Sequence, residues 1–289
     1  MIQVTKSILK DIYKERPKGA YFPKYSFGLL LVIGGGEFYS GSPALSGLAA
    51  FNAGADMVQI IAPKRAADII ASFTPDLAAY PLEGKRVEKK HLATLLTFTE
   101  SGKEVSKGNM AVVIGGGAGR SEETKETILE YLSQVDVPVV IDADAIHALE
   151  KNPGLVRGRP FLITPHTFEF FVLTKKAIYK LSHAEKIEVV KEEAARLQTT
   201  IFLKEKPDII SNGKEVALNK AGSPYMSVGG TGDTLAGICG ALLARNIEPF
   251  KAAQAAAYIS GRAGEVAAER LKEGLVATQV IKAIPEVLH

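Results

Sequence analysis

The sequence predicts an α/β protein built on a doubly wound, mainly parallel sheet with helices on both faces. Short, continuously apolar runs such as residues 29–33 and 111–114 suit strands that are buried on both sides. Helical stretches separate these runs along the chain. Several runs end directly in glycines or polar residues, and sheets of this kind bind ligands at the carboxyl ends of their strands.

Composition agrees with a globular domain of this class. The chain has 289 residues, 46% hydrophobic and 23% charged, without a linker or a repeat, so we predict one domain over residues 1–289. The net charge of +3 suits an anionic small molecule. No Lys/Arg block with interleaved aromatic residues occurs, so we expect no nucleic-acid partner.

Cys239 is the only cysteine, which excludes an intrachain disulfide and a cysteine-based metal site. A reducing, cytoplasmic setting is therefore expected. Residues 1–18 mix charged with apolar side chains, unlike a signal peptide, and no apolar run approaches the length that spans a membrane. We expect no membrane partner.

The first third of the chain predicts a βαβ unit. Residues 8–16 suit a short amphipathic helix that Pro17 ends. Residues 29–33 predict a strand closed by three glycines, residues 43–54 an Ala- and Leu-rich helix, and residues 57–61 a second strand.

The same alternation continues beyond this unit. Residues 86–100 suit a helix, and the strand at 111–114 again runs into glycines, at 115–119. Ser121 followed by two glutamates marks the start of a helix that reaches residue 134. Further strands are predicted at 138–142, 161–164 and 201–204.

Near residue 208 the pattern changes to that of a hairpin. Asn212 and Gly213 lie between the apolar runs 208–211 and 215–218, so the far edge of the sheet is expected to be antiparallel. An alanine-dense helix over 249–268 and a last helix ending near residue 285 follow. Such small-residue helices suit close packing against another subunit.

Residues 229–237 place glycines at the start of a helix whose apolar face includes Leu235 and Cys239. A helix N-terminus without Cβ atoms in front of it accepts a phosphate. Asp233 is unexpected there because a carboxylate repels phosphate, so we predict that it takes a proton from, or orients, a hydroxyl that meets the phosphate. The alternative is an ordinary helix cap in a glycine turn.

Polar side chains follow three of the predicted strands. For Asp142 and Asp144, one carboxylate suits contact with a metal-bound nucleotide while the other caps a helix. The alternative is that both are caps or turn formers. Glu169 suits an indirect Mg²⁺ ligand, because Mg²⁺ keeps most of its waters, and His166 suits a hydrogen-bond donor to substrate. Lys204 is either a cation for the site or a surface lysine.

Taken in order, these stretches resemble one family. Residues 142–145, 164–170 and 229–237, preceded by 34–36 and 39–45, are similar to the ADP/ATP-dependent NAD(P)H-hydrate dehydratases of the ribokinase-like superfamily. The similarity runs from about residue 27 to residue 285. It implies a ribokinase-like fold and a lyase that uses Mg²⁺ and ADP or ATP to dehydrate the S-epimer of hydrated NADH or NADPH, releasing phosphate and AMP or ADP.

The resemblance also implies roles for individual residues. Asp233 is the expected catalytic acid/base at the substrate hydroxyl, and Ser42, Gly117 and His166 join it in contacting the substrate. Glu169 is the residue expected to hold Mg²⁺ through water. The expected nucleotide-binding residues are Lys204, Glu205, Lys206, Pro207, Asp208, Gly230, Thr231 and Gly232.

Four departures from the family pattern stand out. Ser42 replaces the usual alanine, Gly116 a proline, and Thr167-Phe168 a Pro-Gly pair. Glu205 replaces a glycine and so places a negative side chain near the expected phosphates.

The resemblance further implies a homo-oligomer, with hydrated NAD(P)H and an adenine nucleotide as its ligands. No fused N-terminal epimerase domain is expected, so an NAD(P)H-hydrate epimerase would be a separate protein. Two alternatives stay open. One is a ribokinase-like kinase of a vitamin-type hydroxymethyl substrate, and the other is a catalytically idle nucleotide-binding sensor.

Overall fold

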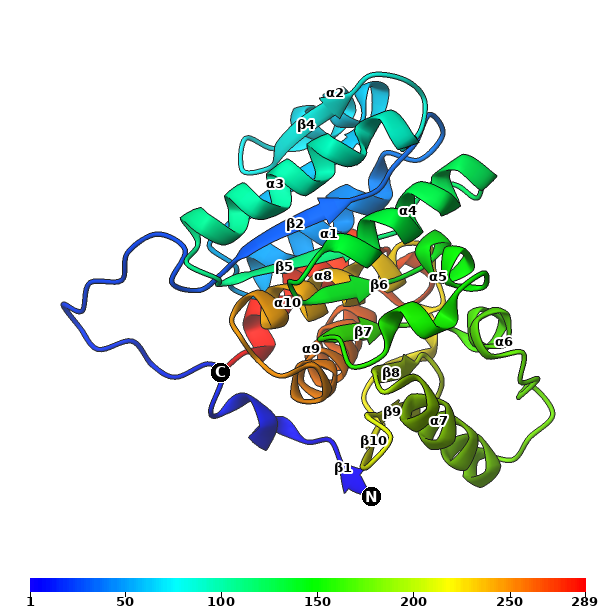
Figure 1. Ribbon diagram of the computed structural model, residues 1–289. Helices are drawn as coiled ribbons and strands as arrows, with labels where there is room; N and C mark the ends of the chain where they lie inside the picture. The colour runs from blue at the N-terminus through cyan, green and yellow to red at the C-terminus, as the bar shows by residue number, and fades with distance from the viewer.

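A single ten-stranded sheet forms the centre of the computed structural model, which describes residues 1–289 (Figure 1). The strands lie in the order β1-β10-β9-β8-β7-β6-β5-β2-β3-β4. Their bounds are β1 (Ile2–Gln3), β2 (Leu29–Ile33), β3 (Met57–Pro63), β4 (Ala78–Leu82), β5 (Met110–Ile114), β6 (Val139–Ile141), β7 (Phe161–Ile163), β8 (Thr200–Leu203), β9 (Asp208–Ser211) and β10 (Val216–Asn219).

The winding of the sheet confirms the predicted fold class. β2 and β5 lie side by side, and from them the chain winds outward in opposite directions, to β4 on one side and to β8 on the other. β9 runs antiparallel to both of its neighbours, while all other pairs are parallel. The predicted hairpin of β9 and β10 is confirmed, although β1 pairs outside it and forms the actual edge.

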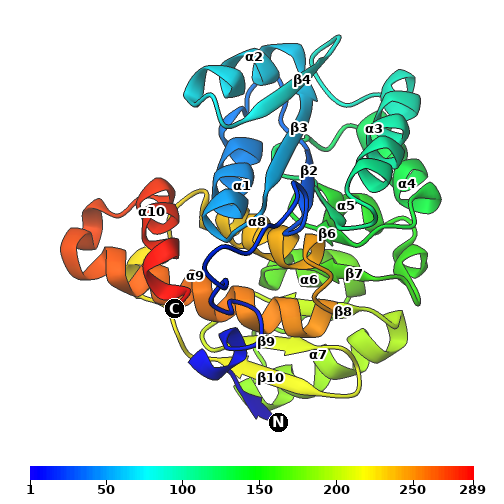
Figure 2. The same cartoon turned by 90° about the vertical axis from the view of Figure 1, so that its left-hand side faces the viewer.

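Helices cover both faces of the sheet (Figure 2). One face carries α1 (Gly41–Asn52), α2 (Lys64–Phe73), α8 (Thr231–Ala244), α9 (Pro249–Leu271) and α10 (Ala277–Val287). The other carries α3 (Leu92–Val105), α4 (Glu122–Gln134), α5 (Asp144–Leu149), α6 (Thr167–Thr174) and α7 (His183–Leu197). Successive residues of β2 enter the two apolar cores alternately, Leu30 on the first face and Leu31 on the second, because side chains alternate along a strand.

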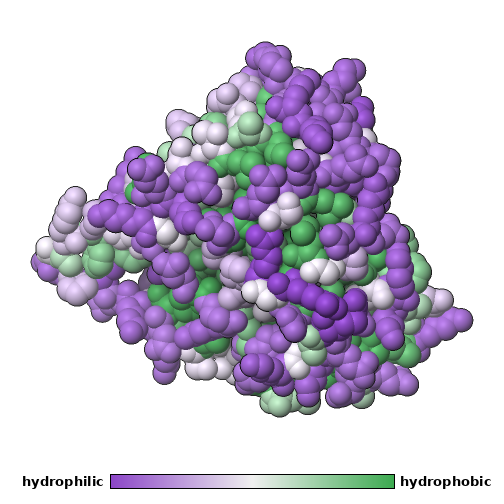
Figure 3. All heavy atoms as spheres, viewed as in Figure 1, coloured by the Kyte–Doolittle hydropathy of each residue, from purple (hydrophilic) through white to green (hydrophobic).

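The predicted helix over 8–16 is wrong. Only a 3₁₀ turn, η1 (Lys6–Leu9), forms there. Tertiary contacts hold the following residues instead: the Arg245 guanidinium donates to the Ile12 carbonyl at 2.8 Å, and the Tyr13 hydroxyl donates to the Ala53 carbonyl at 2.9 Å. Residues 14–24, all exposed, then project from the body as an irregular segment (Figure 1). The surface seen in the same view is largely hydrophilic, with hydrophobic areas near its centre (Figure 3).

Four strands and α-helices have no counterpart in the sequence prediction: β1, α2, β4 and α7. β4 is an edge strand with only Leu82 fully buried, so it lacks the continuous apolar run that marks the central strands. In α7 most positions are charged or half-buried, which weakens the apolar periodicity. The predicted helix over 86–100 begins later, at Leu92, and the last helix continues through Pro285 to Val287.

α9 buries most of its alanines within this chain. The small residues that suggested a subunit contact therefore pack against the sheet and the neighbouring helices α8 and α10. Across the whole chain, no helix combines the length and the apolar character that a membrane span requires.

α8 and α1 pack backbone against backbone. A Cβ atom added at Gly237 would lie 2.1 Å from the Ser46 carbonyl oxygen, so only glycine permits this approach. Gly240, one turn later, lies equally close to the sheet, because a Cβ there would be 2.6 Å from Val113 and 2.7 Å from Leu30. These two glycines fix the depth of α8 against α1 and the sheet.

Gly237→Ala is expected to lower the free energy of unfolding by about 3 kcal/mol, because the added methyl group forces α8 away from α1. Urea denaturation of both proteins measures the change. Gly41→Ala is the matched control, since a Cβ at Gly41 meets nothing within 4 Å. Equal stability of the two variants would show that the helices separate without cost.

Candidate active site

Backbone alone forms the floor of the site, between the ends of β2 and β5. The Gly35 N–H donates to the Gly116 carbonyl at 2.8 Å, and a Cβ at Gly34 would lie 2.4 Å from the same oxygen. Gly115 has φ +123° and its Cβ would lie 2.0 Å from the Asp142 carbonyl. The two glycine loops therefore interlock at the switch point of the sheet, where ligands bind in doubly wound folds.

Asp233 lies above this floor in the first turn of α8. The N-cap of that helix is Gly230, with φ +92°, and no side chain caps it, so Asp233 is not an ordinary helix cap. Its Oδ1 instead accepts a 2.5 Å hydrogen bond from the Ser42 hydroxyl at the start of α1. The helix N–H groups in front of Asp233 have no carbonyl partners within the helix and can bind an anion.

Burial raises the pKa of Asp233 to about 6. The Ser42 hydrogen bond and the positive charge of Lys204 act in the opposite direction, while the negative charges of Asp142 and Asp144 raise the pKa further. A carboxylate with a pKa near neutrality exchanges a proton more readily than one at its ordinary value. This property fits the acid/base role predicted for Asp233.

Lys204 occupies the centre of the charged groups. Its Nζ donates to Asp142 Oδ1 at 2.9 Å and lies 3.7 Å from Glu169 Oε2. Burial acts to lower the pKa of Lys204, but attraction to the neighbouring carboxylates outweighs burial, and the pKa is raised. Thr164 completes the group by donating to Asp142 Oδ1 at 2.7 Å. Lys204 is therefore part of the site rather than a surface lysine.

His166 and Glu169 form a capping box at the start of α6. Nδ1 of His166 accepts from the N–H groups of Phe168 and Glu169, at 3.1 and 3.3 Å, so the ring proton lies on Nε2. Glu169 Oε2 accepts from the His166 N–H at 2.9 Å. Nε2 of the half-exposed His166 lies 3.3 Å from Glu169 Oε1, so this edge of the ring faces the glutamate and the solvent.

Asp144 begins α5, which separates its role from that of Asp142. Its carboxylate accepts from the Gly119 N–H at 2.8 Å and from Arg120 Nε at 2.6 Å. The residue before it, Ala143, has φ +49°, a conformation that costs a non-glycine residue free energy and is common at functional sites. Asp144 thus holds the loop after β5 in place, close to Gly117.

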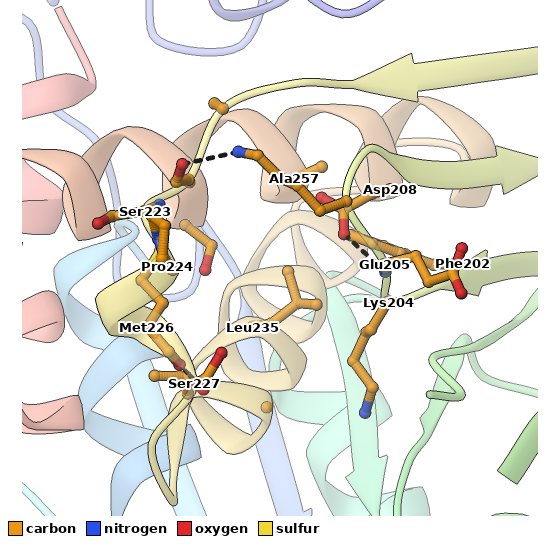
Figure 4. A pocket seen from close by; sticks show the side chains of 17 residues that line it. Phe202, Lys204, Glu205, Asp208, Ser223, Pro224, Met226, Ser227, Leu235 and Ala257 are labelled. Atoms are coloured by element: carbon orange, nitrogen blue, oxygen red, sulfur yellow. Dashed lines mark hydrogen bonds between the residues drawn. The ribbon is translucent and has the colours of Figure 1, made fainter. Parts of the chain in front are cut away.

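A pocket of about 530 Å³ adjoins this cluster on the β8 side (Figure 4). Lys204 and Glu205 lie on one side of it, and Ser223, Pro224 and Met226 on the other. Four further predicted nucleotide-binding residues line it as well: Lys206, Asp208, Thr231 and Gly232. Pro207 and Gly230 do not line it, since Gly230 faces Leu45 of α1.

The negative charge of Glu205 is neutralised within the protein. Its Oε1 lies 2.5 Å from Lys186 Nζ and 3.3 Å from the Thr167 hydroxyl. Lys206 donates to the carbonyls of Lys220 and Gly222, at 2.7 and 2.6 Å, and so ties the two walls of the pocket together. The repulsion that Glu205 suggested from sequence is therefore reduced by its partners.

Asp208 lies at the back of the pocket. Its carboxylate accepts from the Glu205 N–H at 3.2 Å and from the Asn219 side-chain amide at 2.9 Å. Burial raises the pKa of Asp208 to about 7 despite these hydrogen bonds. Sequence reasoning missed Asn219, Thr164, Arg120 and Lys186, because each acts through a partner that is distant in the chain.

The family model for NAD(P)H-hydrate dehydratase matches residues 30–286, nearly the whole chain. The chain belongs to the NAD(P)H-hydrate dehydratase family. The resemblance predicted from the motifs is thereby confirmed.

Relatives agree with this assignment. A bifunctional NAD(P)H-hydrate repair enzyme of Hyperthermus butylicus is 38% identical over 96% of this chain and 51% of its own length. The chain thus spans about half the length of such curated relatives. An ADP-dependent (S)-NAD(P)H-hydrate dehydratase of Cenarchaeum symbiosum is 34% identical, over 90% of this chain and 88% of its own.

Solved structures confirm the ribokinase-like fold. A ribokinase-like superfamily protein of Enterococcus faecalis superposes with a TM-score of 0.83 at 25% identity, covering 99% of this chain and 95% of its own. The ADP/ATP-dependent NAD(P)H-hydrate dehydratase of Bacillus subtilis has a TM-score of 0.77 at 24% identity, with 99% and 97% coverage.

Lys204→Met is expected to destabilise the protein by roughly 3 kcal/mol, because Asp142 and Glu169 lose the cation between them. Adding Asp142→Asn to this variant should restore part of the loss by removing one uncompensated charge. Lys206→Met is the control, expected to cost about 1 kcal/mol, since Lys206 contacts only carbonyls. Chemical denaturation of the wild type, these variants and the single variant Asp142→Asn measures the coupling, and additive losses would contradict it.

Proposed function

We propose that the chain is a lyase that dehydrates the S-epimer of hydrated NADH or NADPH with ADP as co-substrate, releasing phosphate and AMP. The observation that carries this proposal is the pairing of Asp233 with Ser42 between a phosphate-binding helix end and the backbone floor. The Cenarchaeum relative, named an ADP-dependent (S)-NAD(P)H-hydrate dehydratase, supports both the reaction and ADP rather than ATP as donor.

Asp233 takes the proton from the hydroxyl of the hydrated nicotinamide ring. The hydroxyl oxygen forms a bond to the terminal phosphorus of ADP, and the bond from that phosphorus to the bridging oxygen breaks, which releases AMP. Loss of the phosphate from the ring, together with a ring proton, then restores the double bond of NADH. Each step needs a positioned hydroxyl and stabilised phosphate charge.

The protein supplies that stabilisation through Lys204 and the N–H groups at the start of α8. A Cβ added at Gly232 would lie 3.6 Å from Lys204 Nζ, so the cation and the helix end border the same space. Transferred phosphate bound there meets positive potential from both. His166 Nε2, on the α6 side, is placed to donate to the substrate.

The side chains fit a Mg²⁺ ion that arrives with the nucleotide rather than one bound by protein alone. No three His, Cys, Asp or Glu side chains in the chain are grouped to hold a metal. The side-chain hydrogen bonds of Asp142 all use Oδ1, which leaves Oδ2 for a metal-bound water. Glu169 lies close by, because Lys204 Nζ contacts both carboxylates. Mg²⁺ held by phosphates, waters and one or two carboxylates is the usual arrangement and neutralises phosphate charge.

Three further properties stay predictions from the resemblance. They are a homo-oligomeric state, a cytoplasmic location and functional pairing with a separate NAD(P)H-hydrate epimerase. Size-exclusion chromatography with light scattering tests the first of them directly.

The function is tested by mixing the protein with hydrated NADH, Mg²⁺ and either ADP or ATP, and following the absorbance of reduced nicotinamide. We expect recovery of NADH with ADP. Asp233→Asn should lower kcat by about 10³-fold, since it removes the base, while nucleotide affinity stays within about twofold.

Calorimetric titration of ADP into both proteins supplies the control for folding and binding. Absence of NADH recovery with both nucleotides refutes the dehydratase. Full activity of Asp233→Asn refutes the role of Asp233 alone.

The rate is also expected to depend on pH through Asp233. Its carboxylate must be ionised to accept a proton, so kcat/KM should fall about tenfold per pH unit below the pKa of about 6. Ser42→Ala removes a hydrogen bond that lowers this pKa, so the acidic limb should move to higher pH.

Ser46→Ala is the matched control, because Ser46 donates to the backbone carbonyl of Asp233 and not to its carboxylate. Protonation of the ADP phosphates also changes with pH. It affects all three enzymes equally and therefore cancels in the comparison. An unmoved acidic limb in Ser42→Ala would assign the limb to another group.

A further inference from the structure

A group of aromatic rings lies at the N-terminus of α6, where His166 and Glu169 form the capping box. Phe168 is 58% exposed, and its ring centroid lies 6.5 Å from His166, 6.1 Å from His147 and 6.4 Å from Phe171. Single exposed apolar residues are ordinary on protein surfaces. Four rings gathered beside a site are unusual. We call the group of His147, His166, Phe168 and Phe171 the aromatic shelf.

The shelf faces away from the nucleotide pocket. Thr167, next to Phe168, turns toward that pocket and bonds to Glu205, whereas Phe168 lies toward His147 of α5. α5 and α6 are neighbours on the same face of the sheet (Figure 1). Because Phe168 is not among the residues lining the nucleotide pocket, ADP bound there leaves the shelf free.

Charged groups border the shelf on its other side. Arg120 contacts Asp144 through Nε, at 2.6 Å, so its terminal guanidinium nitrogens stay available for a phosphate, and its side chain is 54% exposed. Arg120 follows Gly117 in the loop after β5, where substrate contact is predicted. Within the shelf, the buried Nε2 of His147 has no hydrogen-bond partner.

We propose that the aromatic shelf binds the adenylyl half of the hydrated dinucleotide, with the adenine ring stacked on Phe168 and the pyrophosphate beside Arg120. The proposal rests on the proposed function, since the substrate then has two ring systems and only the nicotinamide meets Asp233. Adenine offers a flat face of the kind that stacks on phenylalanine, and stacking tolerates an exposed position. Phe168 is in this scheme a residue that selects dinucleotides over mononucleotides.

The test compares hydrated NADH with hydrated reduced nicotinamide mononucleotide, which lacks the adenylyl half. Phe168→Leu should raise KM for hydrated NADH about tenfold with kcat unchanged, and leave KM for the mononucleotide unchanged. Phe168→Tyr should keep the wild-type preference because it keeps the ring. Phe73→Leu, which removes a 52% exposed ring at the end of α2, outside the shelf and the site, is the matched control and should change neither KM.

Equal effects of Phe168→Leu on both substrates, or no effect on either, overturn the proposal. A wild-type protein that regenerates no NADH refutes the proposed function instead. In that case, nicotinamide fluorescence gives the dissociation constants of NADH and of reduced nicotinamide mononucleotide. Their ratio tests whether the shelf binds the adenylyl half, independently of turnover. We expect a preference for NADH that Phe168→Leu abolishes, and an unchanged preference overturns it.

Discussion

The backbone contact between α1 and α8 is the constraint on which the site depends. Since Gly237 has no side chain, α8 lies directly on the Ser46 carbonyl. That depth brings Asp233, one turn earlier, against the Ser42 hydroxyl and within the field of Lys204. Close packing transmits small displacements, so the position of Asp233 is set by the fit of two helices that are distant in the sequence.

Electrostatics then determines what this geometry can do. Three carboxylates, from Asp142, Glu169 and Asp233, surround the single cation Lys204 at the carboxyl edge of the sheet. Such a group would be costly to bury without hydrogen bonds, and Thr164 and the capping box of α6 supply them. The helix end and Lys204 border one space and give it positive potential, which suits an anion. Burial raises the pKa of Asp233 toward neutrality.

Most of the fold was predictable because its central strands are buried on both sides. Continuous apolar runs marked β2, β3, β5 and β8, and the Asn212-Gly213 pair marked the hairpin. Prediction failed where elements are half-exposed or held by distant partners. The apolar periodicity of β4 and α7 is weak. The segment after η1 has a helical pattern, but its conformation is set by the hydrogen bond from Arg245 to the Ile12 carbonyl.

The sequence by itself determined the family, the order of the motifs and the residue types that carry charge at the strand ends. Those are local properties, because a glycine loop, a capping residue or an apolar run is legible within a few positions. Only the tertiary structure decided that Asp233 is no helix cap, that Lys186 neutralises Glu205, and that Phe168 lies beside His147. Each of these depends on a contact between separate segments, whose direction and distance are set by packing and not by neighbouring residues.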